Sequence, residues 1–171
     1  LYSRTALVTE QSTDISTWSI NKLNSRITQL YKASLNNAAL LKNTSLQGLE
    51  AILTKGQNSR NLRPTLYDLL AHRALDYFIN DENEVTQPSY HFIINNEAVF
   101  APVKTFVATK FNAADTASTY YQTIILMQEL LQFHMESKNT EALLDADLKR
   151  LSFANDHGVF TNKNKLYEQA L

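Results

Sequence analysis

Only three glycines and three prolines occur among the 171 residues of this chain. Average usage would give roughly a dozen glycines and about eight prolines. Tight hairpins and glycine-rich phosphate loops need backbone conformations that glycine alone adopts at low cost. The scarcity of both residues therefore disfavours all-β sandwiches, all-β barrels and glycine-rich nucleotide-binding loops, and it favours a helical chain.

The length and composition indicate one folded domain. Hydrophobic residues make up 44% of the chain and charged residues 19%, which is apolar enough to bury a sizeable core. Because the sequence begins at Leu1 rather than Met and ends within a helical pattern, we expect residues 1–171 to be a single helical domain that was processed or excised from a longer protein. The absence of cysteine excludes a disulfide scaffold, thiolate metal sites and a cysteine nucleophile.

The charge is balanced, with 16 basic and 17 acidic residues and a formal net charge of -1. Such a chain has no long-range field to attract a polyanion, so nucleic acid is disfavoured as a partner. No apolar run approaches the roughly 20 residues that a membrane-spanning helix needs. We expect no transmembrane segment in these residues.

Apolar residues recur every three or four positions along most of the chain, which is the pattern of amphipathic helices. A polar lead-in ends in a short helical turn near Trp18, and Ser19 has the character of a helix N-cap. Asp115 has the same character before the longest helix, and Pro64 suits a first helical turn. The predicted helices span 20–35 with a loose continuation to 41, then 45–56, 64–80, 116–135, 141–154 and 163–171.

Two details of this pattern are specific enough to test. Gly56 is placed to end the predicted helix 45–56. A connection of a few residues makes 116–135 and 141–154 an antiparallel pair. Four leucines of the second member are expected to face inward, and they are Leu143, Leu144, Leu148 and Leu151.

Residues 81–102 interrupt the helical period, and Pro88 and Pro102 lie within this stretch. We expect an irregular loop with at most one short strand, packed down by its own aromatic residues. Those aromatic residues are Tyr90, Phe92, Phe100 and Phe106. No fixed repeat period occurs, so the predicted fold is all-α, an irregular helical bundle or antiparallel helix-hairpin array with one long irregular loop.

One cluster of titratable residues shares a helix face. Asp68, His72 and Asp76 follow one another at intervals of four, with Arg73 beside them. The spacing could serve a carboxylate-oriented histidine or part of a metal site. The zinc-hydrolase pattern of two histidines four apart is missing, and a third ligand cannot be located. We therefore interpret the four residues as a structural polar cluster, with no catalytic, metal or cofactor role.

The remaining candidates for chemistry are weaker. His91, His134 and His157 are scattered, and no Gly-x-Ser-x-Gly nucleophile motif occurs. Aromatic residues at helical spacing are expected in the core rather than in a carbohydrate-stacking platform. Those residues are Tyr67, Tyr77, Phe78, Tyr120 and Phe133. An enzyme is disfavoured, although a pocket joining His72 to a second histidine would revive a small hydrolase.

The segment 63–78, Arg-Pro-Thr-Leu-Tyr-Asp-Leu-Leu-Ala-His-Arg-Ala-Leu-Asp-Tyr-Phe, resembles a stretch of very large alpha-2-macroglobulin-like proteins of Bacteroidetes. In that family the stretch lies in the helical region that precedes the β-sandwich domains. Segments 14–18, 52–56, 90–102 and 147–151 extend the resemblance over nearly the whole chain.

The resemblance implies that residues 1–171 are a fragment of a much larger multidomain chain. It also implies an exported protein, often lipid-anchored, that faces the periplasm or cell surface and acts as a protease trap or a related defence protein. The family's Cys-Gln thioester cannot be present here, since the chain has no cysteine. What the resemblance leaves for this segment is a scaffold role, in which it contacts other domains of the same chain and meets proteases only through the full-length protein. The anchor would lie outside these residues.

Two function classes remain open at this point. The first is a non-catalytic scaffold or interaction module of such a cell-envelope protein. The second is a stand-alone helical module that binds a peptide or glycan. In the first, Asp68, His72 and Arg73 are expected to fasten the helix 63–78 to the aromatic loop.

Overall fold

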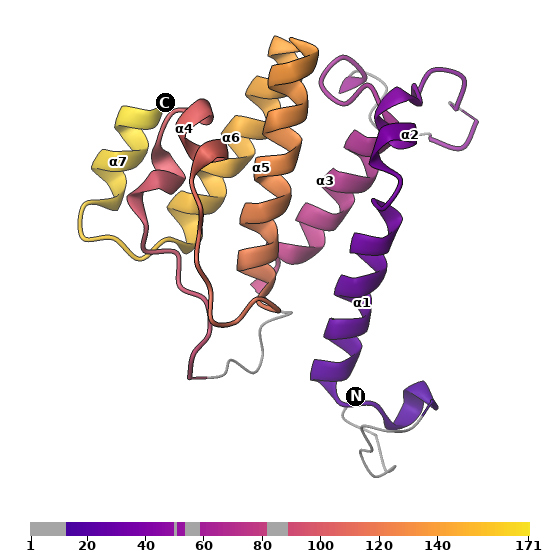
Figure 1. The fold of residues 1–171 in the computed structure, drawn as a ribbon, viewed down its shortest axis with the longest axis horizontal. Helices are drawn as coiled ribbons and strands as arrows, with labels where there is room; N and C mark the ends of the chain where they lie inside the picture. The colour runs from indigo at the N-terminus through magenta and orange to yellow at the C-terminus, as the bar shows by residue number, and fades with distance from the viewer. Residues whose placement is uncertain (1–12, 50, 54–58, 82–88) are drawn as a thin grey trace.

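The computed structural model describes residues 13–49, 51–53, 59–81 and 89–171, and over these ranges the protein is all-α, as predicted (Figure 1). The described elements are η1 (Ile15–Thr17), α1 (Ile20–Ser34), α2 (Ala38–Asn43), α3 (Leu66–Phe78), η4 (Glu97–Phe100), α4 (Val103–Ala108), α5 (Thr119–Ser137), α6 (Thr140–His157) and α7 (Lys163–Ala170). An isolated antiparallel bridge joins Ser45 to Thr65, and no strand forms in the described residues.

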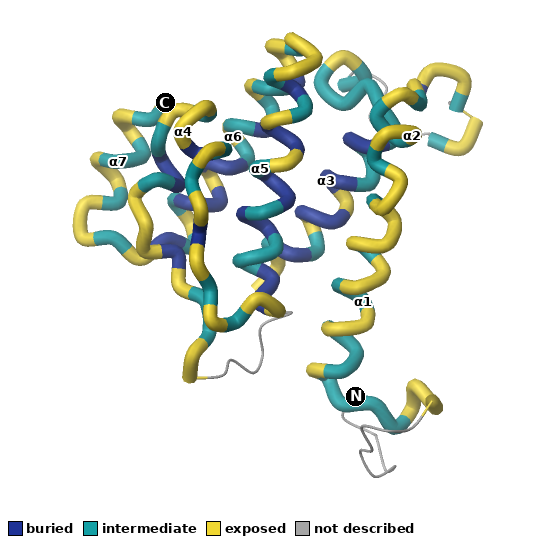
Figure 2. The backbone as a smooth tube through the Cα atoms, in the orientation of Figure 1, coloured by how far each residue is buried: buried dark blue, intermediate teal, exposed yellow. Residues whose placement is uncertain are grey.

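Helix α5 lies at the centre of the molecule. It packs against α6 most extensively and also contacts α3 and α4, while α7 and η4 cover α6 from the other side (Figure 1). Figure 2 shows that the buried residues concentrate on α3, α5 and α6. We call the assembly of α3, η4 and α4–α7 the body.

Helices α1 and α2 form an arm, residues 20–43, that lies along one side of the body (Figure 1). Both helices of the arm contact α3, and neither contains a buried residue. The arm is therefore attached through half-buried side chains on one face.

Several predicted helix ends are confirmed. The side chain of Ser19 accepts a hydrogen bond from the Lys22 N–H, so it is the N-cap of α1. Asn139 caps α6 in the same way. Helices α5 and α6 are joined by Lys138 and Asn139 alone, and Lys138 takes the left-handed conformation that reverses the chain.

The prediction of a helix over 45–56 is wrong for its described residues. Residues 45–49 and 51–53 form a bridge and turns instead, with Gly48 at φ +87°. Backbone hydrogen bonds pair Leu46 with Pro64 and Leu66 with Thr44. Backbone hydrogen bonds to residues 64–66, at the start of α3, take the place of the helical hydrogen bonds that the apolar spacing had predicted for this segment. Gly56 and Pro88 lie outside the described residues.

Two other predicted starts move by a few residues. Thr65, rather than Pro64, caps α3, so Pro64 precedes the helix and its φ constraint serves the bridge segment. Ser118 is the N-cap of α5, whereas the Asp115 side chain accepts from Ala117 N–H in the preceding turn.

The inward face of α6 also differs from the prediction. Leu151 is buried and Leu143 packs against the core, but Leu144 and Leu148 are 58% and 45% exposed. The buried face is carried instead by small residues, Phe153 and one arginine: Ala142, Ala146, Arg150, Leu151, Phe153 and Ala154. Small residues let α6 approach α5 closely.

The irregular segment is ordered by side chains that satisfy its backbone carbonyls. Arg150 is 2% exposed and donates to the carbonyls of Val99 and Ala101 at 2.9 and 2.8 Å. Its guanidinium also pairs with Asp147 and lies 4.6 Å from the centre of the Phe106 ring. A charged donor to buried carbonyls replaces the backbone partners that a helix or sheet would supply.

Gln128 has a similar role at the end of α4. Its Nε2 donates to the carbonyls of Phe106 and Thr109 at 2.7 and 2.8 Å. The predicted packing of the loop by aromatics is confirmed for Phe100 and Phe106, which are buried, and Phe92 is half-buried. It is wrong for Tyr90, which is 62% exposed.

Glycine is required where α6 ends. A Cβ on Gly158 would lie 2.4 Å from the Ala154 carbonyl oxygen and 2.5 Å from the Phe160 ring. The next residue, Val159, donates its N–H to the Ile94 carbonyl. The close approach therefore fastens the chain after α6 to the irregular segment. Within the described ranges, no helix has both the length and the apolar character needed to cross a membrane.

Candidate functional site

The polar cluster begins at the first turn of α3. The Thr65 hydroxyl accepts from the Asp68 N–H, and the Asp68 carboxylate accepts from the Thr65 N–H at 2.8 Å, which is a capping box. Asp68 is fully buried, so its Oδ2 is committed to the helix start.

The other oxygen of Asp68 faces α5. His134 Nε2 lies 3.0 Å from Asp68 Oδ1, and both side chains are almost completely excluded from solvent. The alignment of the two groups falls outside hydrogen-bond geometry, and His134 Nδ1 has no partner among the described residues. The pair joins α3 to α5 inside the body, where no substrate could reach it.

His72 is also buried, at 3% exposure, but it faces α6. Its Nε2 lies 3.8 Å from the Asp145 carboxylate, which is beyond hydrogen-bond distance, and Asp145 instead accepts from Arg63 Nε at 3.0 Å. Burial lowers the pKa of His72 to about 4, and the positive charges of Arg63 and Lys149 add to that effect. His72 is therefore neutral at pH 7, and the carboxylates of Asp145 and Asp68 oppose the lowering of its pKa only in part.

Asp76 and Arg73 lie on the exposed side of α3. Asp76 pairs with Lys149 of α6, and its side chain is 64% exposed. The structure thus divides the predicted cluster. Asp68 pairs with His134 of α5, whereas His72 and Asp76 face Asp145 and Lys149 of α6. The expectation that Asp68, His72 and Arg73 fasten α3 to the aromatic loop is not met by Asp68 and His72 within the described residues, because Asp68 meets His134 of α5 and His72 faces Asp145 of α6.

The other histidines have separate surroundings. His157, at the end of α6, lies 2.9 Å from the Tyr120 hydroxyl and 3.3 Å from Asp81. The Tyr120 hydroxyl also bonds Asp81, so the three groups tie the ends of α3, α5 and α6 together. Within the described ranges no three histidine, aspartate or glutamate side chains are grouped closely enough to hold a metal ion.

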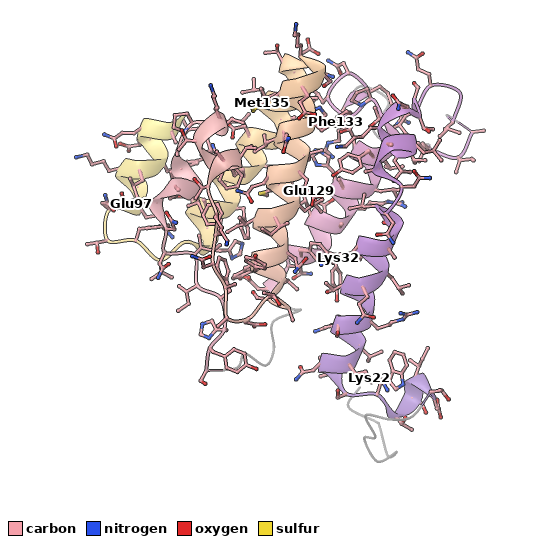
Figure 3. The ribbon with its side chains drawn as sticks, viewed as in Figure 1. Lys22, Lys32, Glu97, Glu129, Phe133 and Met135 are labelled. Atoms are coloured by element: carbon pink, nitrogen blue, oxygen red, sulfur yellow. The ribbon has the colours of Figure 1, made fainter. Side chains whose placement is uncertain are left out.

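A groove of about 520 Å³ separates the arm from α5. Tyr67 and Phe78 of α3 form its apolar floor, with Leu126 of α5 beside them. Figure 3 labels Lys32 on α1 and Glu129 on α5, which lie on opposite sides of this groove. Its lining residues lie along α1, α2 and α5. Grooves between helices are a common kind of binding site for helical peptides.

The rims of the groove carry opposite charges. Lys32 and Lys42 lie on the arm, whereas Glu129 and Glu136 lie on α5. The Lys42 ammonium lies over the Tyr67 ring, 4.8 Å from its centre. The Tyr67 hydroxyl donates to Glu129 at 3.5 Å, and burial together with that carboxylate raises the tyrosine pKa well above its usual value.

Stacked aromatic rings fix the position of the arm. Tyr31 of α1 stacks on Tyr77 with ring centres 5.2 Å apart and meets Phe78 edge-on at 6.0 Å. The Tyr77 hydroxyl donates to the side chain of Asn24 at 3.2 Å. These contacts hold the wall of the groove in place against α3.

Sequence reasoning assigned the aromatic residues to the core without locating the groove. Tyr67 and Phe78 are core residues, as predicted, and Tyr77, Tyr120 and Phe133 pack at its edge. The groove residues Lys32, Glu129 and Glu136 gave no local signal, because their positions on two distant helices meet only in the folded chain. The low glycine content and the broad apolar face of 119–137 were the available hints that α5 has several neighbours.

Comparison of the chain with protein-family models, with curated proteins and with solved structures found no match.

Proposed function

We propose that this protein is a non-catalytic helical interaction module that binds another polypeptide segment in the groove between the arm and α5. The observation that carries the proposal is the groove itself, with a floor of buried aromatic rings and rims of opposite charge. A module of this kind fits the periplasmic or cell-surface setting of an alpha-2-macroglobulin-like protein, held to the envelope by a segment outside these residues.

The shape and chemistry of the groove favour a polypeptide over a small polar ligand. Its volume, about 520 Å³, is within the range of ligand sites, yet it is open along its length. Apolar side chains of a segment would cover the half-buried Leu35, Ala38 and Ile125 of the lining. Its charged side chains would pair with Lys32 or Glu129. Opposite charges on the rims would set the direction of the bound segment.

The occupant we propose is a segment of another domain of the same polypeptide. The residues that resemble the alpha-2-macroglobulin-like family, 63–78, include both aromatic residues of the groove floor. In that family the helical region adjoins further domains of one chain, which are at high effective concentration. Contact with a protease would then occur only through the full-length protein.

A cross-linking experiment tests the occupant directly. The chain has no cysteine, so Gln132→Cys on the α5 rim places one reactive thiol beside the groove. In the polypeptide encoded by the whole gene, a short thiol-to-amine cross-linker should join this position to residues outside 1–171 of the same polypeptide, as identified by mass spectrometry. Ser152→Cys, on the exposed face of α6, is the matched control and should give no such product.

The result also separates the two function classes. Cross-links from Gln132→Cys to the same polypeptide support the scaffold role. A gene that stops shortly after residue 171 contradicts it and favours a stand-alone module. The same conclusion follows if the thiol of Gln132→Cys is equally reactive in residues 1–171 alone and in the full-length polypeptide.

A further inference from the structure

A second cavity, on the opposite side of α3 from the groove, has the chemistry of an anion site. It measures about 340 Å³ and lies between α3 and the described residues 46–53 and 59–63, residue 50 excepted. Three arginines line it: Arg60, Arg63 and Arg73. The chain as a whole has a net charge of -1 and therefore no excess of basic residues. Three arginines around one small cavity are thus not explained by composition alone.

Each arginine retains donors for a ligand. Arg60 donates Nη2 to the Leu53 carbonyl at 3.0 Å, which fixes the side chain and leaves its other N–H groups. Arg63 donates Nε to Asp145, so its terminal nitrogens are uncommitted among the described contacts. Arg73 is exposed at the edge of the cavity. Fixed guanidinium groups present paired donors that match the two oxygens of a carboxylate.

The acidic groups nearby do not neutralise this set. Asp76 lines the cavity and pairs with Lys149, and Asp145 pairs with Arg63. Arg60 and Arg73 are then the charges in excess. Of the three arginines, Arg63 contributes to the low pKa of His72, after the larger effect of burial.

The wall of the cavity contains a buried polar group without a partner. His72 is 3% exposed, and neither of its ring nitrogens has a hydrogen-bond partner in the part of the chain that the structure describes. Leaving such a group unsatisfied costs free energy, so a hydrogen-bonding group bound in the cavity would stabilise the imidazole. A neutral imidazole can donate one hydrogen bond to a carboxylate oxygen.

Apart from Ser59 and Asp76, the rest of the described lining is apolar. Leu46 is fully buried there, and Leu53 and Leu69 are half-buried beside it. A free inorganic anion would leave these side chains without contacts. From this combination we propose that the cavity binds a small organic carboxylate, with its anionic end among Arg60, Arg63 and Arg73 beside His72 and its apolar body against the leucines.

Nuclear magnetic resonance with hexanoate as the probe tests the site. Hexanoate should shift the His72 imidazole resonances in a saturable manner, and a bound negative charge should raise the pKa of that histidine from about 4. Arg73→Gln should weaken binding about tenfold or more, the loss of one charge-assisted hydrogen bond. Because Arg73 is exposed, this variant keeps the fold.

Three comparisons make the test decisive. Arg26→Gln removes an equal charge from the exposed face of α1 and should leave the affinity within about twofold. Hexanol and inorganic phosphate should each bind much more weakly than hexanoate. The proposal is overturned if hexanoate produces no saturable shift at about 50 mM, if Arg26→Gln weakens binding as much as Arg73→Gln, or if either comparison ligand binds equally well.

Discussion

The arm and the body differ in how a helix gains its stability. Helix α1 has the sharper division between apolar and polar faces, yet it contains no buried residue. Helix α5 has a diffuse apolar pattern and is buried along most of its length. A helix with a single apolar stripe packs against one neighbour, whereas a helix with a broad apolar surface needs several. A sharp division between the two faces therefore indicates few neighbouring elements, and it does not indicate deep burial.

The polar contacts of the body are also more deeply buried than those of the arm. In the body, buried Arg150 and half-buried Gln128 satisfy backbone carbonyls of other elements. In the arm, the Tyr77 to Asn24 bond and the Tyr31 stacking lie near the surface. The body therefore has the character of a rigid platform, and the arm that of one wall placed on it.

The largest effect should come from Arg150→Ala. The change removes two hydrogen bonds to the carbonyls of Val99 and Ala101 and leaves both acceptors in the core. We expect a loss of about 3–5 kcal/mol in the free energy of unfolding, measured in urea. Arg26→Ala in the arm should cost less than about 0.5 kcal/mol. A loss below about 1 kcal/mol for Arg150→Ala would show that the irregular segment does not depend on it.

His72 should make the body sensitive to acid. The unfolded chain takes up a proton below pH 6.5, whereas the folded protein resists protonation of His72 until its pKa of about 4. This group contributes nothing to the pH dependence above 6.5, and as pH falls from 6.5 to 4 it removes about 3 kcal/mol of stability.

Urea unfolding at pH 7 and pH 4.5 measures this effect. His72→Gln should lose clearly less stability over that interval than the parent protein, while His91→Gln, outside the α3 region, should lose as much as the parent. Equal losses for the parent and His72→Gln would contradict the assignment.

In the arm, Tyr31→Ala should act locally. It removes the contacts with Tyr77 and Phe78, worth about 1–2 kcal/mol with the buried area included. Amide hydrogen exchange should accelerate in α1 and remain unchanged in α5. Tyr90→Ala, at a largely exposed position, should leave both unchanged. Faster exchange throughout α5 would mean that the arm and body unfold together.

The smallest effect, and a stabilising one, is expected at the turn between α5 and α6. Lys138 has φ 56°, in the left-handed region that favours glycine. Lys138→Gly should raise the midpoint of thermal unfolding by relieving about 1 kcal/mol of backbone strain. Lys138→Ala keeps the Cβ and should give no gain, so a similar gain from both would point to charge rather than backbone.

The sequence predicted those parts of the fold that depend on local patterns. The all-α class, the Ser19 boundary and the α5–α6 hairpin follow from a capping residue, apolar spacing and a short connection. The predicted helix 45–56 failed because Leu46 and Thr44 bond the chain ahead of α3, which no local pattern records.

The candidate sites required the tertiary fold. The spacing of Asp68, His72 and Asp76 placed them on adjoining positions of α3, but only packing decides that Asp68 meets His134 and Asp76 meets Lys149. Leu144 and Leu148 appeared inward because a leucine is usually buried, whereas the close contact of α6 selected alanines. Arg60 was not singled out, since its role depends on turns that the sequence had suggested were helical.

The central claim is that a rigid body carries a separately attached arm, with a binding groove between them. Native-state hydrogen exchange, followed residue by residue at increasing low concentrations of denaturant, tests it most directly. The account predicts that the amides of α1 open at a lower free energy than those of α5, and that the amides of α5 exchange only through global unfolding. Equal opening free energies in the two helices would contradict it.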